Sequence, residues 1–449
     1  MTWGFDTIKS RHWTKNGFMP GIKGMKGIIM HKYIEVLQKE VAPAQGCTEP
    51  IAVAYGVSIA AEQLEGPAES IQLYLSGNIV KNALGVGIPG TGRTGIDIAA
   101  LLGAVIRRSD KKLEILNGMT EEQLQQAEAL LEKKILKVSL KEDTTERLYI
   151  EAVVQGGGHT GRCIIVKSHT NVVLIEKDGV ASLKKEVAAS EEADDHVEMS
   201  VKEIYEFATT IPFEEISFLL EGAKMNRAVS QEGLRGDYGL RVGKAFSGAL
   251  GGLMQPTLGG DIVAAAAAAS DARMDGCPMP VMTTGGSGNQ GISCTVAATA
   301  LAEKLGKSDE ELARALALSD LITVHIKSYI GRLSPLCGSG IAGGTGSCCA
   351  MIYLMGGKLP QIERGIQSML ANHMGMICDG AKTTCALKIA TGIQSAVLCA
   401  TLAMQDISPT EKEGIVCKDV EETIRGVGLL SNEGVPQLDP TILQVMLNK

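Results

Sequence analysis

The pattern of apolar residues changes near residue 200, and this change constrains the fold more than any other feature of the sequence. Before it, short runs rich in Val, Ile and Leu, bounded by Gly, Asp or Asn, predict β-strands. These runs are residues 71–76, 135–140, 148–154, 163–168 and 172–177. The last three lie close together and predict an antiparallel meander. Helical patterns are expected at 33–37, 50–64, 96–107 and 120–132.

After residue 200 almost every segment has a helical pattern, with Ala, Leu and Met runs separated by Gly-rich turns. The fold class predicted is therefore α+β, an N-terminal α/β lobe with a mostly antiparallel sheet followed by a mainly α-helical domain. The lobe is expected at residues 30–185 and the helical domain at 201–449, joined by an acidic, solvated linker at 186–200. Residues 1–29 are basic and Gly-rich and are predicted to be a disordered extension or a start-codon artefact.

Composition excludes several classes of protein. A net charge of −8 without a clustered basic face argues against a nucleic-acid partner. No secretory signal and no run of about 18 strongly apolar residues is recognised, so a membrane span is not expected. The 11 cysteines lack a regular disulfide spacing, which indicates a reducing, cytoplasmic location. The run 264–269, all alanine, predicts a close helix crossing.

Three cysteines in the C-terminal half are candidate metal ligands. Cys337 lies in SPLCGSG, and Cys378 and Cys385 lie in GMICDGAKTTCALK. Each is next to glycine or charge rather than inside an apolar run, and Gly380 would let a loop fold two sulfurs toward one centre. An iron–sulfur cluster with only three thiolate ligands has one iron free to bind a substrate atom. Such a set therefore suggests catalysis rather than electron transfer.

Several segments carry a family resemblance, namely 42–50 (APAQGCTEP), 76–92 (SGNIVKNALGVGIPGTG), 168–171 (SHTN), 285–292 (GGSGNQGI) and 375–388 (GMICDGAKTTCALK). From about residue 30 to the end, the chain resembles the L-cysteine desulfidase family, and its second half resembles the α domain of bacterial iron–sulfur L-serine dehydratases. The resemblance implies a [4Fe–4S] cluster on Cys337, Cys378 and Cys385 in the helical domain. It also implies β-elimination of L-cysteine to sulfide, ammonia and pyruvate. L-Serine dehydration at the same cluster is the alternative.

Cys47 is the candidate catalytic residue. It precedes Thr48, Glu49 and Pro50, which predict a helix N-terminus, where the helix dipole favours a thiolate. The resemblance implies that this cysteine is catalytic or is a labile ligand of the open iron. Both roles stay open at this point.

The chemistry also requires groups that hold the amino acid. Removing a weakly acidic Cα proton needs a base, and no lysine here lies in a recognisable pyridoxal-phosphate context. Polar residues in Gly-rich or turn segments are the candidates for substrate binding. They are Ser76, Asn78, Asn82, His169, Thr170, Asn171 and Asn289. Each has an ordinary structural explanation, as a helix cap or a tight turn, that the sequence does not exclude.

Three rival interpretations remain. Cys348 and Cys349 are close enough in sequence to Cys337 to replace one ligand. His373 could complete a Cys₃His zinc site, which would make the chain a non-catalytic, zinc-stapled binding protein. The glycines at 85, 87 and 90 spell GxGxxG, but Pro89 interrupts the motif and a Rossmann site is not expected. Glycine-rich helix ends would suit a homo-oligomer interface as well as an active site.

Overall fold

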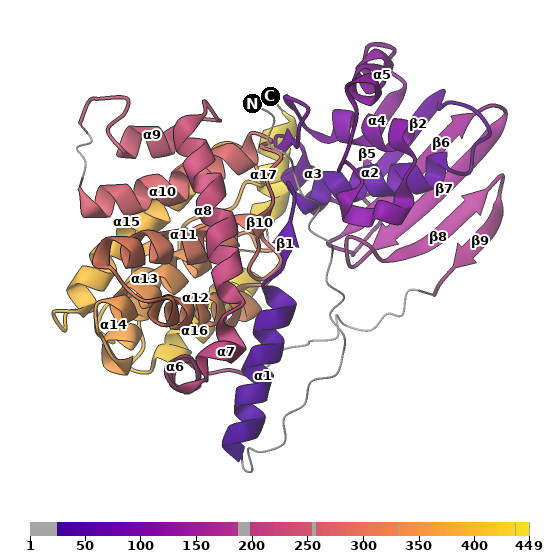
Figure 1. Cartoon of the computed structure of the whole chain (residues 1–449). Helices are drawn as coiled ribbons and strands as arrows, with labels where there is room; N and C mark the ends of the chain where they lie inside the picture. The colour runs from indigo at the N-terminus through magenta and orange to yellow at the C-terminus, as the bar shows by residue number, and fades with distance from the viewer. Residues whose placement is uncertain (1–24, 187–197, 254–256, 332, 436, 449) are drawn as a thin grey trace.

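The computed structural model describes residues 25–186, 198–253, 257–331, 333–435 and 437–448. Figure 1 shows a sheet-containing lobe beside a helical domain, as the change near residue 200 predicts. The α+β class is confirmed. Residues 1–24 and most of the acidic segment 186–200 lie outside the described residues, but helix α1 already begins at Met25, inside the expected extension.

The lobe is built on a six-stranded sheet in the order β5-β2-β6-β7-β8-β9. Only the pair β2–β5 is parallel. The strands are β2 (Ser70–Leu75), β5 (Leu136–Leu140), β6 (Tyr149–Gly156), β7 (His159–Val166), β8 (Val172–Lys177) and β9 (Val180–Lys184). Strands β6 to β9 form an antiparallel meander, which confirms that prediction and adds β9 to it. Buried residues alternate along β2, as expected of a strand with one face on the core.

Helices cover one face of this sheet. They are α2 (Thr48–Ala61), α3 (Gly77–Ala83), α4 (Ile96–Ile106), the 3₁₀ helix η1 (Ser109–Glu114) and α5 (Glu121–Glu132). Helix α2 packs on β6 and β7 and against α4. Helix α5 begins with a capping box in which Thr120 and Gln123 exchange hydrogen bonds.

The helical domain has a second, separate core. Its elements are α1 (Met25–Glu40), α6 (Val201–Thr210), α7 (Phe213–Ile216), α8 (Leu219–Arg235), α9 (Val242–Phe246), α10 (Leu258–Met274), α11 (Gly288–Leu305), α12 (Asp309–Ile330), the π-helical turn η2 (Ser339–Gly343), α13 (Gly344–Leu354), α14 (Leu359–His373), α15 (Cys385–Ala403), α16 (Val420–Leu429) and a second π-helical turn η3 (Leu430–Gly434). The last helix, α17 (Leu438–Leu447), packs on α3, and its Leu443 contacts the core of the lobe. The alanine run is buried in α10, which packs on α8, α9 and α15 as a close helix crossing.

Two features depart from the expected organisation. Helix α1 was expected in the first lobe, but Tyr33 and Leu37 are buried in the core of the helical domain. Helix α15 is long and apolar enough, by length and composition, to cross a membrane, although no such segment was expected. Ile389 and Ile393 on α15 are buried, and the helix packs against α10, α13 and α14. This burial is typical of the central helix of a folded domain.

The lobe and the helical domain meet through short backbone contacts. The two-residue strand β1 (Pro43–Ala44) pairs with β10 (Val281–Met282) of the helical domain. The two-residue strands β3 (Gly87–Ile88) and β4 (Arg93–Thr94) pair with each other. After β3, the N–H of Gly90 donates to the carbonyl of Gly276 at 3.1 Å. Lys81 on α3, which is only 3% exposed, forms an ion pair of 2.7 Å with Asp439 on α17.

Candidate active site

Backbone pairing brings Cys337 and Cys378 together. The N–H of Cys337 donates to the carbonyl of Met376 at 2.8 Å, and the N–H of Cys378 donates to the carbonyl of Pro335 at 2.7 Å. Cys337 lies two residues before η2, a π-helical turn of a kind that is frequent at functional sites. Two cysteines far apart in sequence therefore lie on adjacent extended segments.

Cys385 completes the group as the first residue of α15. Burial raises the pKa of its thiol to about 12, and the charges of Cys337 and Cys378 act in the same direction. Burial likewise raises the pKa of Cys337, with a contribution from the charge of Cys378. The three sulfurs are thus within electrostatic reach of one another, as the sequence predicts.

Two lysines lie near these sulfurs, Lys382 in the loop between Cys378 and Cys385 and Lys388 in the first turn of α15. Lys388 binds the carboxylate of Asp379, and Lys382 binds its backbone carbonyl. Burial lowers the pKa of Lys382, although the charges of Asp379, Cys385 and Cys378 oppose this. The ammonium groups of Lys382 and Lys388 can therefore stabilise negative charge on the thiolates.

The arrangement fits an iron–sulfur cluster better than a single ion. Zinc needs its ligand atoms within about 2.3 Å, so that its sulfurs nearly touch. Among the described residues, no three His, Cys, Asp or Glu side chains are gathered that closely. A [4Fe–4S] cluster is larger than a single ion and is usually held by cysteine thiolates. Cys337 is buried, Cys378 and Cys385 are half-buried, and lysines lie close by, so the three cysteines have the donor chemistry that a cluster needs.

His373 does not join the cysteines. Burial alone lowers the pKa of its imidazole, and none of the three thiols acts on it. The proposed Cys₃His zinc set is therefore not assembled in this structure.

The rival cysteines also lie elsewhere. Cys348 and Cys349 are buried on α13, and the thiols that raise the pKa of Cys348, after burial, are those of Cys349 and Cys399. Cys399 belongs to the same helical core, as its apolar surroundings predict. No ligand substitution by these residues is supported.

Cys47 lies beside the three-cysteine site. It is the N-cap residue of α2, 5% exposed, and packs with Val86 and Met274. Ala381 and Cys385 pack against this small group. Cys47 thus lies close to the segment that carries the candidate ligands Cys378 and Cys385.

Burial works against a thiolate at Cys47, contrary to the expectation from its place at a helix N-terminus. Burial raises its pKa well above the ordinary value, and the adjacent Glu49 carboxylate raises it further. The positive charge of Arg273 only partly opposes this. In the structure the thiol donates a hydrogen bond of 2.9 Å to Oε2 of Glu49.

Glu49, which the sequence marked only as part of a helix start, is the centre of the polar site. Its Oε1 accepts a hydrogen bond of 3.2 Å from Nδ2 of Asn82. Burial would raise its pKa, but His169, the Cys47 thiol and Arg273 together hold the pKa below its ordinary value. Nε2 of His169 is buried and has no hydrogen-bond partner among the described residues. Asn82 and His169 therefore lie at the site, as predicted.

Asn289 also lies at the site, because it accepts a hydrogen bond from Arg273. The sequence did not indicate Arg273 as a site residue. Nη1 of Arg273 donates to Oδ1 of Asn289 at 3.1 Å. Nη2 donates to the carbonyl of Gly46 at 2.8 Å, directly before Cys47. Arg273 ends a long apolar helix, so no local motif distinguishes it in the sequence.

Of the other predicted binding residues, two make hydrogen bonds that stabilise the local backbone, and two make no described side-chain hydrogen bond. Oγ of Ser76 donates to the carbonyl of Arg147, and Nδ2 of Asn171 donates to the carbonyl of Val166. These bonds are those of a strand end and a turn, which corrects the expectation that both side chains face the substrate. Thr170 is exposed. Asn78 is half-buried with no described hydrogen bond, so its role stays a prediction.

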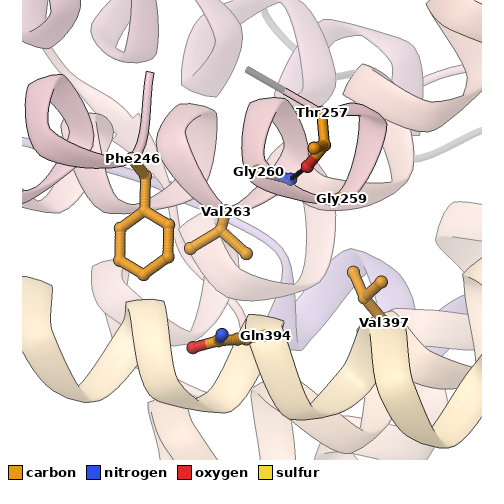
Figure 2. Close-up of a pocket in the computed structure, with 7 residues that line it drawn as sticks. All are labelled: Phe246, Thr257, Gly259, Gly260, Val263, Gln394 and Val397. Carbon is orange, nitrogen blue, oxygen red and sulfur yellow. Dashed lines mark hydrogen bonds between the residues drawn. The ribbon is translucent and has the colours of Figure 1, made fainter. Parts of the chain in front are cut away.

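A separate cavity of about 250 Å³ lies at the opposite end of α10 (Figure 2). Its lining is mostly apolar, with Thr257 and Gln394 as the polar side chains. Oγ1 of Thr257 accepts a hydrogen bond from the N–H of Gly260, as an ordinary helix cap. Because the cavity offers no acid, base or nucleophile, the chemistry is assigned to the cysteine site.

Comparison with known proteins identifies the family. Residues 110–444 match the serine dehydratase alpha chain family. A protein of Clostridium perfringens named UPF0597 protein is 51% identical over 419 residues, 93% of this chain and 98% of the relative. The UPF0597 protein BF3560 of Bacteroides fragilis is 44% identical over 418 residues, 93% of this chain and 97% of the relative. The chain therefore belongs to the serine dehydratase alpha chain family.

Proposed function

We propose that this chain is a pyridoxal-phosphate-independent lyase that eliminates sulfide from L-cysteine at a [4Fe–4S] cluster held by Cys337, Cys378 and Cys385. One observation carries the proposal, namely that Cys385 packs against the small cluster that contains Cys47, while Cys47 donates a hydrogen bond to Glu49. A proton-transfer group thus adjoins a three-thiolate site. Membership of the serine dehydratase alpha chain family supports a serine dehydratase-like lyase.

When bound, a cluster with three thiolate ligands supplies one Lewis-acidic iron for the leaving atom of the substrate. The residues of the chain supply the remaining needs of the reaction. As a base removes the Cα proton, the electron pair of the Cα–H bond forms a Cα=Cβ double bond. The Cβ–S bond breaks, and its electron pair leaves with sulfur. The released aminoacrylate tautomerises and hydrolyses to pyruvate and ammonia without further catalysis.

Proton removal is assigned to Cys47 together with Glu49. To act as a base, the thiol must first lose its own proton, and Oε2 of Glu49, 2.9 Å away, is the acceptor. The charge of Arg273 favours the resulting thiolate. His169 can then share the proton, because its charge already interacts with Glu49. In this proposal Cys47 acts as the base, and the role of labile ligand is the alternative.

The surroundings of Cys47 favour a thiol over a hydroxyl as leaving group. Val86, Met274 and Ala381 make this part of the site apolar and sulfur-rich. A buried hydroxyl would need a hydrogen-bond partner there, whereas a thiol behaves as a small, polarisable hydrophobe. L-Serine dehydration remains the second candidate because of the name of the matched family. Free thiols at all eleven cysteines suit a reducing compartment, and we propose a cytoplasmic location.

The first experiment is anaerobic purification followed by iron, acid-labile sulfide and zinc analysis, with visible spectra before and after L-cysteine. About four irons and four sulfides per chain and a cysteine-dependent spectral change are expected. Sulfide and pyruvate release from L-cysteine, compared with pyruvate release from L-serine, separates the two substrates. Stoichiometric zinc without sulfide would refute the proposal.

Two variants make the assignment specific. Cys378→Ser should lose cluster and activity while the fold persists, because the chain is long enough to have a well-buried core without a metal. Cys399→Ser, at a buried cysteine of the helical core, is the matched control and should keep its iron. Equal iron loss in both variants would contradict the ligand assignment.

A further inference from the structure

Arg273 is a buried cation whose described partners are all neutral. It is 7% exposed, at the C-terminal end of α10. Its acceptors are the side-chain amide of Asn289, the backbone carbonyl of Gly46 and, at 3.9 Å, the thioether of Met274. Nε is buried and has no partner among the described residues. Its charge acts on the Glu49 carboxylate only through space, without a described ion pair, so its free N–H groups can bind a further anion.

The guanidinium is held in place by its surroundings. A Cβ on Gly288, the first residue of α11, would lie 2.4 Å from Nε of Arg273. The planar group therefore lies directly against the glycine backbone. Asn289, Gly46 and Met274 take three of its five N–H donors, which leaves the N–H of Nε and one N–H of Nη2 for a planar, two-oxygen anion.

The position of Arg273 relates this anion to the reacting atoms. Its hydrogen bond to the carbonyl of Gly46, the residue before Cys47, places the guanidinium beside the Cys47 loop. Cys47 in turn belongs to the small cluster against which Cys385 packs. A short amino acid bound here would have its carboxylate at Arg273 and its β-substituent toward the three cysteines. Its Cα would then lie near Cys47 and Glu49.

From this geometry we propose that Arg273 is the binding residue for the α-carboxylate of the substrate and restricts the site to free amino acids. The inference rests on the proposed function for the identity of the ligand. Its physical basis, a pre-oriented buried cation beside Cys47, is independent of which leaving group is expelled.

The test measures binding rather than turnover. The cluster-loaded protein is titrated anaerobically by calorimetry with 3-mercaptopropionate, which has a carboxylate and a thiol, and with cysteamine, which has a thiol but no carboxylate. Arg273→Gln should lower the affinity for 3-mercaptopropionate about 100-fold, the size expected for loss of a paired charge-assisted hydrogen bond. Cysteamine binding should not change. Arg227→Gln, which removes an arginine paired with Glu303 on the surface, is the control and should change neither affinity.

A second variant keeps Arg273 and its bond to the Cys47 loop. Asn289→Asp places a carboxylate where Oδ1 now lies, 3.1 Å from Nη1, so it should compete with the ligand and also weaken 3-mercaptopropionate selectively. This variant carries the test if Arg273→Gln does not fold.

The outcomes separate the inference from the proposed function. If Arg273→Gln lowers the affinity for both ligands equally, Arg273 only positions the Cys47 loop, and the inference is overturned. Wild-type protein that binds 3-mercaptopropionate no better than cysteamine would also overturn it. If carboxylate preference is present and is lost in the variants, while neither L-cysteine nor L-serine is consumed, the carboxylate site stands and the proposed lyase activity fails.

Discussion

Gly380 tests whether the ligand loop depends on contact with the N-terminal lobe. Its φ is +92°, and a Cβ there would lie 2.0 Å from the backbone carbonyl oxygen of Lys81 on α3. Gly380→Ala therefore adds two costs. Alanine at this positive φ costs about 1–2 kcal/mol, and overpacking against a fixed backbone group costs about 1–3 kcal/mol more. The free energy of unfolding should fall by about 2–5 kcal/mol, the sum of the two costs.

Gly356 provides a matched control, because its φ is +91° and nothing lies within 4 Å of the added Cβ. Gly356→Ala should show only the backbone cost of about 1–2 kcal/mol. Denaturant unfolding of both variants, purified anaerobically, gives the two free energies, and iron analysis shows whether the displaced Cys378 still binds. Equal destabilisation and equal iron content in the two variants would refute the reasoning.

Three further perturbations address the lobe contact, a buried acid and the proton path. Asp439→Asn leaves the buried Lys81 ammonium without its counterion and should lower the free energy of unfolding by about 1–3 kcal/mol, measured by denaturant unfolding. Burial raises the pKa of Asp320 to about 7, so the folded state holds an extra proton between about pH 4 and pH 7. Wild-type stability should therefore fall as pH rises through that range and level off above it, by up to about 4 kcal/mol. Asp320→Asn should flatten this slope in unfolding curves, and an unchanged slope would exclude Asp320 as its source. Glu49→Gln removes the acceptor for the Cys47 proton and should lower kcat about 10²–10⁴-fold with little change in KM, in a sulfide-release assay. An unchanged kcat would remove Glu49 from the proton path.

Local patterns were sufficient to predict most of the secondary structure. The alternating runs before residue 200 became β2 and the meander β6 to β8, because strand periodicity depends only on neighbouring residues. Strand β9 was missed, since it is short and mostly exposed and so lacks a clear apolar alternation. Helix α1 was placed in the wrong domain, because periodicity predicts a helix but not the core on which it packs.

The sequence by itself determined the ligand candidates and the position of Cys47. Cys337, Cys378 and Cys385 stand in glycine-rich or charged segments, and Cys47 precedes a helix start, while their roles were implied by the family resemblance and stay predictions. For Ser76 and Asn171 the same reasoning failed, because a polar residue at a strand end or turn can bond its own backbone, and only coordinates show which bond forms.

Only the tertiary structure decided the electrostatics of the site. Arg273 reaches the carbonyl of Gly46 across 227 residues of sequence, and Glu49 becomes the acceptor of the Cys47 proton because packing buries them together. The raised pKa of Cys47 has the same origin, since burial disfavours its thiolate. Periodicity and glycine placement are local and can be read along the chain, whereas burial and charge act through space and depend on which distant segments the fold brings into contact.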